Sequence, residues 1–243
     1  MPDQLVELVR RWLEFSSVDS KAIPRTETIE AGFEFDGEAT RPGADPRVIG
    51  AWENRHGFRL PSGLRHWLAL SNGLYRHGPL IHPISAIGPM VPFARVPGMI
   101  VQPESWFELG NPNVETICID LGYHWPGGGN PIFTSGDDEA GSPPRIIASS
   151  FDEWFLNLIR HGGREYWFDP GFTPLGSPWE CHCRHTPPPQ LPERLGLLAE
   201  RVRPLIDHEP DERAIANEFG ISRTEAELLL RHIQHRSAGF DGP

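Results

Sequence analysis

Long apolar runs and cysteines are both scarce in this 243-residue sequence. No stretch approaches the roughly 18 consecutive apolar residues that a membrane-spanning helix needs. The start, MPDQLVELVRRWLEF, is amphipathic and charged, which is not the pattern of a secretory signal peptide. Three cysteines, an odd and small number, make no disulfide framework and are typical of a reducing compartment. We therefore expect a cytoplasmic protein.

Recognisable catalytic and cofactor-binding motifs are also missing. The sequence contains no Gly-x-Ser-x-Gly, His-Glu-x-x-His or paired-cysteine redox motif. The glycine-rich segment HWPGGGNP lacks the Gly-Lys-Ser/Thr ending of a phosphate-binding loop, so we interpret it as a loop between strands. We expect no catalytic residues, no cofactor and no bound metal.

Basic residues are fewer than acidic ones, 22 against 33, and the formal net charge is -11. A field of this sign repels nucleic acid and speeds the encounter with basic partners. We therefore expect a basic protein partner, and neither a membrane nor a nucleic acid as partner. Acidic surfaces are common among soluble proteins, so charge alone does not identify the function.

The apolar content, 38% hydrophobic and 10% aromatic residues, is enough for one sizeable core and a smaller appended unit. We predict a first domain over residues 1–165, in which 1–44 form an amphipathic helix and a long connection. Repeated prolines predict a linker over residues 166–190. Apolar residues at helical spacing then predict a helical extension over 191–243.

Short apolar runs separated by Gly, Pro, Asn and Asp fill residues 79–148, including SWFELG, ETICIDLG, NPIFTSG and PRIIASS. Runs of this length and punctuation are typical of strands, so they predict a meandering, mostly antiparallel sheet. The next segment, SSFDEWFLNLIRHGG, has one apolar helical face and a capping-box pair, Ser150 and Glu153. This helix has to cover the sheet. The predicted fold class is α+β, a mostly antiparallel sheet with packed helices.

Two short helices are predicted before the sheet. Asp45 is suited to cap the first helix and Pro46 to begin it, whereas Pro61 begins the second and Asn72-Gly73 closes it. The Glu53–His56 pair has the spacing used in di-iron bundles, but such a site needs two of these pairs and the sequence supplies one. We interpret the pair as a surface ion pair at a helix end.

The segment WECHCRH, residues 179–185, places two cysteines and two histidines within five residues. Structural zinc sites are tetrahedral and usually take pairs of ligands from two places in the chain, and no second Cys-x-x-Cys is present. A remote histidine such as His161 would be needed to complete a site. Zinc binding therefore stays an alternative to a proline-bounded loop with idle thiols.

An ordered set of residues resembles the start of the SUKH superfamily, which joins fungal cell-wall (glucan) synthesis regulators to bacterial immunity proteins: Trp52-Glu53, Gly57, Leu60-Pro61, Leu68 and Asn72-Gly73. ICIDLG, PIFTSGDDEAG and SSFDEWFLNLI resemble the later elements of that family, so the likeness spans about residues 45–165. The resemblance implies an α+β domain that binds another protein and, in bacteria, often neutralises a toxin, commonly a nuclease. It implies no catalytic residues.

Residues that bind the partner are expected on acidic loops at the edge of the sheet. Asp137, Asp138 and Glu139 are the main candidates, with Trp125 as an aromatic anchor and Asp120 as a further contributor. The structural alternatives are solvated acids in a turn for the acidic trio and a turn-capping aspartate for Asp120.

A helix-turn-helix is the main competing interpretation of the tail, whose helical patterns lie at about 191–206, 211–219 and 222–236. The stretch AIANEFGISRTEAELLLRHI resembles such a turn, although an ordinary helix stop and capping box explain the same residues. Residues 190–243 contain seven arginines and ten acidic residues, which leaves no basic face for a DNA backbone. A regulator whose tail binds DNA or another protein is the alternative function.

Overall fold

The structure is a computed structural model that describes residues 41–75, 79–90, 99, 101–112, 115–136, 142–161, 163–208 and 211–238. The predicted N-terminal helix and most of the connection over 1–44 lie outside these residues, as does the acidic trio Asp137–Glu139. None of the helices in the described ranges is long and apolar enough to cross a membrane.

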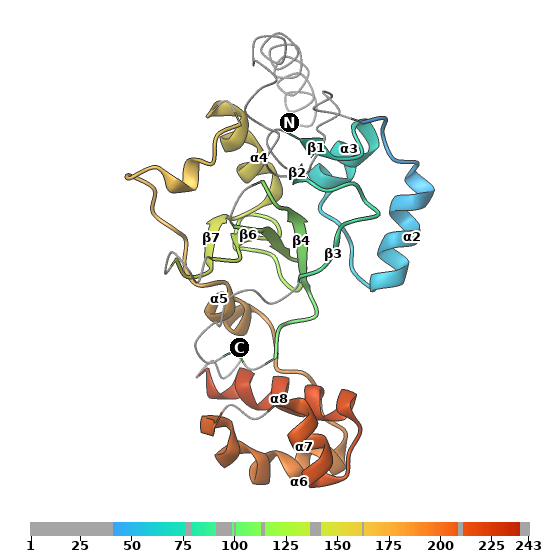
Figure 1. The fold of residues 1–243 in the computed structure, drawn as a ribbon, viewed down its shortest axis with the longest axis vertical. Coiled ribbons are helices and arrows are strands. Elements are labelled where there is room, and N and C mark those ends of the chain that lie inside the picture. Colours follow the sequence, from blue (N-terminus) through green and yellow to red (C-terminus); the bar gives the residue numbers. More distant parts are fainter. Residues whose placement is uncertain are drawn as a thin grey trace, which may run out of the picture.

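A five-stranded antiparallel sheet forms the middle of the molecule (Figure 1). Its strands lie side by side in chain order: β3 (Gly88–Pro89), β4 (Trp106–Gly110), β5 (Ile117–Asp120), β6 (Ile132–Thr134) and β7 (Arg145–Ala148). A separate hairpin joins β1 (Leu74–Tyr75) to β2 (Pro79–Ile81). The predicted antiparallel meander and the α+β fold class are confirmed.

Helices α2 (Pro46–His56), α3 (Ser62–Leu70) and α4 (Phe151–Arg160) build the core on one face of the sheet. Trp52 of α2 reaches the sheet at Phe107, with ring centroids 5.1 Å apart, and its Nε1 donates a hydrogen bond to the Ile87 carbonyl. Trp67 of α3 meets Phe155 of α4, with centroids 4.9 Å apart. The apolar face predicted for α4 is therefore a face that packs.

The second face of the sheet is covered by α5 (Pro178–His185), so the prediction of a linker over 166–190 is wrong. This segment also contains a 3-10 turn, η2 (Tyr166–Phe168), and its Gly176 carbonyl accepts a hydrogen bond from Ile146 of β7. Trp179, Cys181 and Cys183 of α5 are buried against the sheet. Residues 178–185 are therefore part of the packed structure around the sheet.

The apolar side chains of the strands alternate between the two faces. In β4 and β5, Phe107 and Ile119 belong to the core under α2–α4, whereas Trp106 and Cys118 belong to the core under α5. Successive residues of a strand point to opposite faces, so an uninterrupted apolar run marks a strand that is buried on both. ICI in β5 is such a run, and the need for a second cover follows from it.

The tail forms a small helical unit below α5 in Figure 1, made of α6 (Glu193–Val202), η3 (Arg203–His208), α7 (Glu212–Phe219) and α8 (Arg223–Ser237). The three predicted helical segments are thus confirmed. Gly220 ends α7 in the left-handed conformation, and Ser222 and Glu225 form a capping box that begins α8. The apolar faces of these helices make their own core: Val202, Ile215, Ala226, Leu229, Leu230 and Ile233.

Local signals account for the start of α2 and only partly for the end of α3. The Asp45 side chain accepts a hydrogen bond from the Arg47 amide, and Pro46 is the first residue of α2. The predicted left-handed close of α3 is wrong, because Ser71 ends the helix in an extended conformation. The Asn72 side chain instead accepts a hydrogen bond from the amide of Ile84.

Glu53 stabilises the connection between α2 and α3. Its side chain is fully buried, and it lies 2.8 Å from Arg59 Nη1 and 3.3 Å from Arg65 Nη1. It also accepts a hydrogen bond from the Leu60 amide. The interpretation of Glu53 and His56 as a surface ion pair is therefore wrong, since the carboxylate turns inward and the His56 ring packs beside core aromatic rings.

Replacing Glu53 by alanine is expected to lower the free energy of unfolding by about 2 kcal/mol, because the buried Leu60 amide loses its acceptor. Urea unfolding followed by tryptophan fluorescence measures the change. Glu200→Ala is the control, because Glu200 is 73% exposed and lies 3.9 Å from an exposed arginine. Equal stability of the two variants would contradict the structural role of Glu53.

Candidate functional site

Asp120, at the end of β5, is the centre of a buried polar network on the α5 side of the sheet. Its Oδ1 accepts hydrogen bonds from the Ser105 hydroxyl and the Gly122 amide, at 2.7 and 2.8 Å. Its Oδ2 lies 2.9 Å from Trp106 Nε1 and 2.7 Å from His182 Nδ1. The carboxylate is fully used inside the protein, so the expectation that it contributes to a docking surface disagrees with its position.

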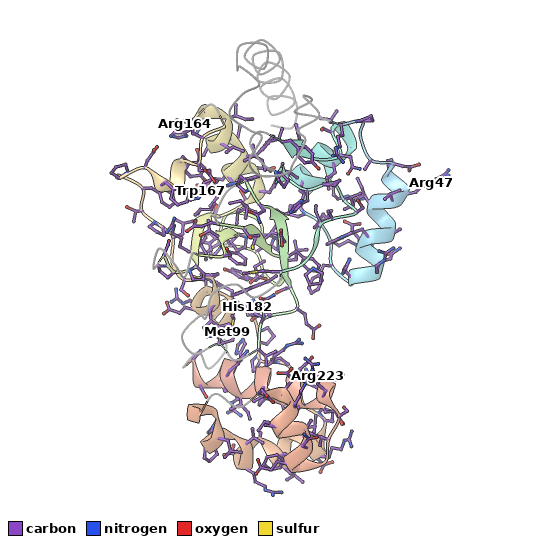
Figure 2. The ribbon with its side chains drawn as sticks, in the orientation of Figure 1. Arg47, Met99, Arg164, Trp167, His182 and Arg223 are labelled. Carbon is purple, nitrogen blue, oxygen red and sulfur yellow. The ribbon has the colours of Figure 1, made fainter. Side chains whose placement is uncertain are left out.

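His182 carries this network from the sheet to α5. A carboxylate only accepts hydrogen bonds, so Nδ1 of His182 donates to Asp120. The imidazole stacks on Trp179 at 6.2 Å between ring centroids and lies 6.3 Å from the ring of His235 in α8. Figure 2 shows His182 between the sheet and the tail. The Asp120–His182 pair therefore links the sheet, α5 and the tail.

The network differs from a catalytic triad in the bonds it makes. In a triad the serine hydroxyl is bonded to the histidine, which takes its proton. Here the Ser105 hydroxyl donates to Asp120, the same carboxylate that holds His182. The serine is thus a second ligand of the aspartate, and the bond that would activate it as a nucleophile is not made.

The cysteines of α5 are packing residues. Cys181 and Cys183 are buried in the core under α5, and burial raises the pKa of both thiols, that of Cys183 to about 12. Thiolates are the form that binds metals, so these cysteines are poor ligands as they stand. Among the described residues no group of three or more His, Cys, Asp or Glu could hold a metal ion. The WECHCRH segment is a helix rather than the loop we expected.

Trp125 lies in the loop between β5 and β6, where it is half-buried against α5. Its backbone makes a tight turn with Gly128 and Gly129, and its ring centroid lies 6.1 Å from that of His185. Part of its surface is therefore used to hold the loop on α5. Its role as an aromatic anchor stays a prediction, and the expected roles of Asp137, Asp138 and Glu139 concern residues outside the described ranges.

Polar contacts fasten the tail to the rest of the molecule. The buried side chain of Gln234 in α8 bonds to both backbone groups of Val101, which leads into β4. Arg231 pairs with Glu104, and His235 Nε2 lies 3.1 Å from the Thr186 hydroxyl at the end of α5. These side chains, together with His182, attach the tail to the sheet and α5. No local pattern in the sequence predicted this role.

The charged residues at the start of α8 are engaged within the tail. Arg223 pairs with Glu212 of α7 and lies 3.3 Å from Glu227, and Arg194 of α6 pairs with Glu225. A recognition helix needs these positions to contact bases and phosphates. The pairs instead tie α8 to α6 and α7, which favours a packing role for the turn around Gly220.

Replacing Asp120 by asparagine is expected to lower the free energy of unfolding by about 2 kcal/mol, since an amide nitrogen would face hydrogen-bond donors. Chemical denaturation measures the change. Glu218→Gln, on the exposed side of α7, is the matched carboxylate-to-amide control and should leave stability unchanged. If Asp120→Asn is as stable as the control, the network does not stabilise the contacts between the sheet, α5 and the tail.

The stability of the protein should fall in acid partly through His235. Burial lowers the pKa of His235, and His182 acts in the same direction. His235 Nδ1 is buried and has no hydrogen-bond partner in the part of the chain that the structure describes. The unfolded chain takes up this proton at about pH 6.5, so stability is lost as the pH falls from there toward the lower folded pKa.

His235→Gln keeps a donor for the Thr186 hydroxyl oxygen and removes the titration. We expect this variant to lose less unfolding free energy than the unmodified chain between about pH 7.5 and about pH 5.5. The control is His66→Gln, at an exposed position of α3, which should retain the full pH dependence. Identical pH profiles for His235→Gln and the unmodified chain would show that His235 does not set the acid sensitivity.

Comparison with known proteins does not assign a family to the chain. No protein-family model matches it, and no curated protein matches it significantly. The function of the chain is therefore inferred from its contacts, burial and charge.

Proposed function

We propose that this chain is a non-catalytic, protein-binding domain, and more specifically an immunity protein that neutralises a toxin by direct contact. The toxin domain would be basic, and a nuclease is the class that the resemblance to the SUKH superfamily suggests. Such a protein would act in the cytoplasm, where it would meet the toxin domain.

The use of ionisable side chains inside the fold is the observation that carries the proposal. The described residues contain two histidine–carboxylate pairs, Asp120–His182 and His82–Glu108, at 2.7 and 3.0 Å. The first joins the sheet to α5, and the second joins the strand residue Glu108 of β4 to the end of β2. These ionisable groups hold elements of the fold together. We therefore expect the function to be binding at the outer surface.

The fold class is compatible with the proposal. Residues 45–165 form two short helices, an antiparallel sheet and one amphipathic helix, and the resemblance to the SUKH superfamily implies a domain of the same α+β class. A fold alone does not determine a function, so the choice between binding and catalysis depends on the site. The acidic surplus of the chain adds the expected sign of the partner.

The proposal is tested with the catalytic domain of a toxin encoded beside the gene for this chain. Isothermal titration calorimetry should give a one-to-one complex with a Kd of about 1 nM, typical of tight protein complexes of standard size. The toxin's activity should disappear at the same ratio. Absence of a complex, or chemical conversion of the toxin by this chain, would overturn the proposal.

The acidic trio should act mainly on the rate of association. Asp137→Lys/Asp138→Lys/Glu139→Lys is expected to slow association with the toxin domain about tenfold and to flatten its salt dependence, with little change in dissociation. Stopped-flow fluorescence measures these rates. Glu193→Lys/Glu200→Lys/Glu218→Lys makes the same change of net charge on exposed tail positions. An equal effect of this control would show that the trio is not a docking surface.

A further inference from the structure

Helix α2 packs with one side only. Ile49, Trp52 and Glu53 are buried toward the rest of the protein. The opposite side faces outward at the margin of the molecule, where Figure 2 places the Arg47 side chain pointing away from the body. We call this side the α2 face, and its exposed residues are Arg47, Val48, Ala51, Asn54 and Arg55.

The α2 face is basic although the chain is acidic. Residues 41–75 contain five arginines and only two acidic residues, whereas the whole chain has 22 basic and 33 acidic residues. Of these two acids, Glu53 is buried on Arg59 and Arg65, and Asp45 caps the helix. Within the described ranges, the guanidinium groups of Arg47 and Arg55 have no ion pair. Their charges are therefore available to a partner.

Arg47 lies where a positive charge is unfavourable for the helix. It is the second residue of α2, and the first turn of this helix contains no acidic residue. The positive end of the helix dipole disfavours a cation there. An anionic group bound beside Arg47 would offset this unfavourable placement.

We propose that the α2 face docks an acidic protein surface. Val48 is 50% exposed and, with Ala51, forms an apolar centre between Arg47 and Arg55. Those two arginines are separated by about 12 Å along the helix axis. An apolar centre with charged residues at its rim is the composition of a protein interface. A nucleic-acid backbone would instead require a continuous basic surface.

This inference goes beyond the proposed function, which concerns a basic toxin domain and acidic loops at the edge of the sheet. The α2 face lies on the β3 side of the sheet in Figure 1, whereas β7 forms the opposite edge. The protein thus has a second docking surface for a partner region of opposite charge. The partner at the α2 face is a separate acidic protein, because the toxin domain of the proposed function is basic.

The test uses the full chain and a fluorescent, helical peptide that has leucines on one face and glutamates beside them. Anisotropy titration should show binding that Arg47→Glu/Arg55→Gln weakens about tenfold, a loss of roughly 1.4 kcal/mol. The matched control is Arg213→Glu/Arg160→Gln, which changes an arginine at the second position of α7 and one in the last turn of α4. This control should bind like the unmodified chain.

Val48→Ser distinguishes a protein-type surface from simple charge attraction. It should weaken binding of the amphipathic peptide and leave binding of poly-L-glutamate unchanged. The proposal is overturned by no binding of the peptide, by equal losses in the two double variants, or by tighter binding of duplex DNA through Arg47 and Arg55. Titration with the toxin domain is a separate measurement, so failure of this inference is distinguishable from failure of the proposed function.

Discussion

Apolar side chains on both faces of the five-stranded sheet are the constraint on which the rest of the molecule depends. Phe107 and Ile119 face one side, and Trp106, Cys118 and Phe133 face the other. Water cannot cover either face without a large loss of hydrophobic stabilisation, so the chain has to supply two covers. Helices α2–α4 provide the first. The second comes from α5, which also determines where the tail attaches.

Asp120 is a buried carboxylate on the second face, and its burial accounts for the next set of contacts. A buried carboxylate is costly unless hydrogen bonds replace the water that it loses. Ser105, Trp106, Gly122 and His182 supply these bonds. Because His182 belongs to α5, satisfying the carboxylate also positions this helix, whose end then receives α8. A single desolvated group thereby couples three parts of the chain.

Features set by neighbouring residues were predictable from the sequence. The Asp45-Pro46 start of α2, the Ser150 cap of α4 and the Ser222–Glu225 capping box each depend on groups within a few residues of one another. The strands followed from short apolar runs between turn residues. These signals are local, so they act in the same way before the fold is known.

The second cover was not predictable in the same way. Residues 179–185 contain a glutamate, an arginine and two histidines, and prolines flank them, so the segment has no apolar stripe that marks a core helix. The run ICI in β5 does indicate a face that needs a cover, but it does not say which segment provides it. The Asp120–His182 bond joins residues 62 positions apart, and no local pattern encodes it.

Net charge and local charge act over different distances, which explains how an acidic chain can have a basic docking face. Salt screens exposed charges beyond about 8 Å at physiological ionic strength, so the whole-chain charge acts mainly on the approach of a partner. Once two surfaces are in contact, the side chains within a few ångströms of each other determine whether the contact is favourable. On α2 these are Arg47 and Arg55, since the nearby acids are buried or engaged in capping. Glu53 is buried, and its contacts fix the corner after α2. Its carboxylate is therefore not on the outer face of α2, where it would otherwise neutralise Arg47 and Arg55.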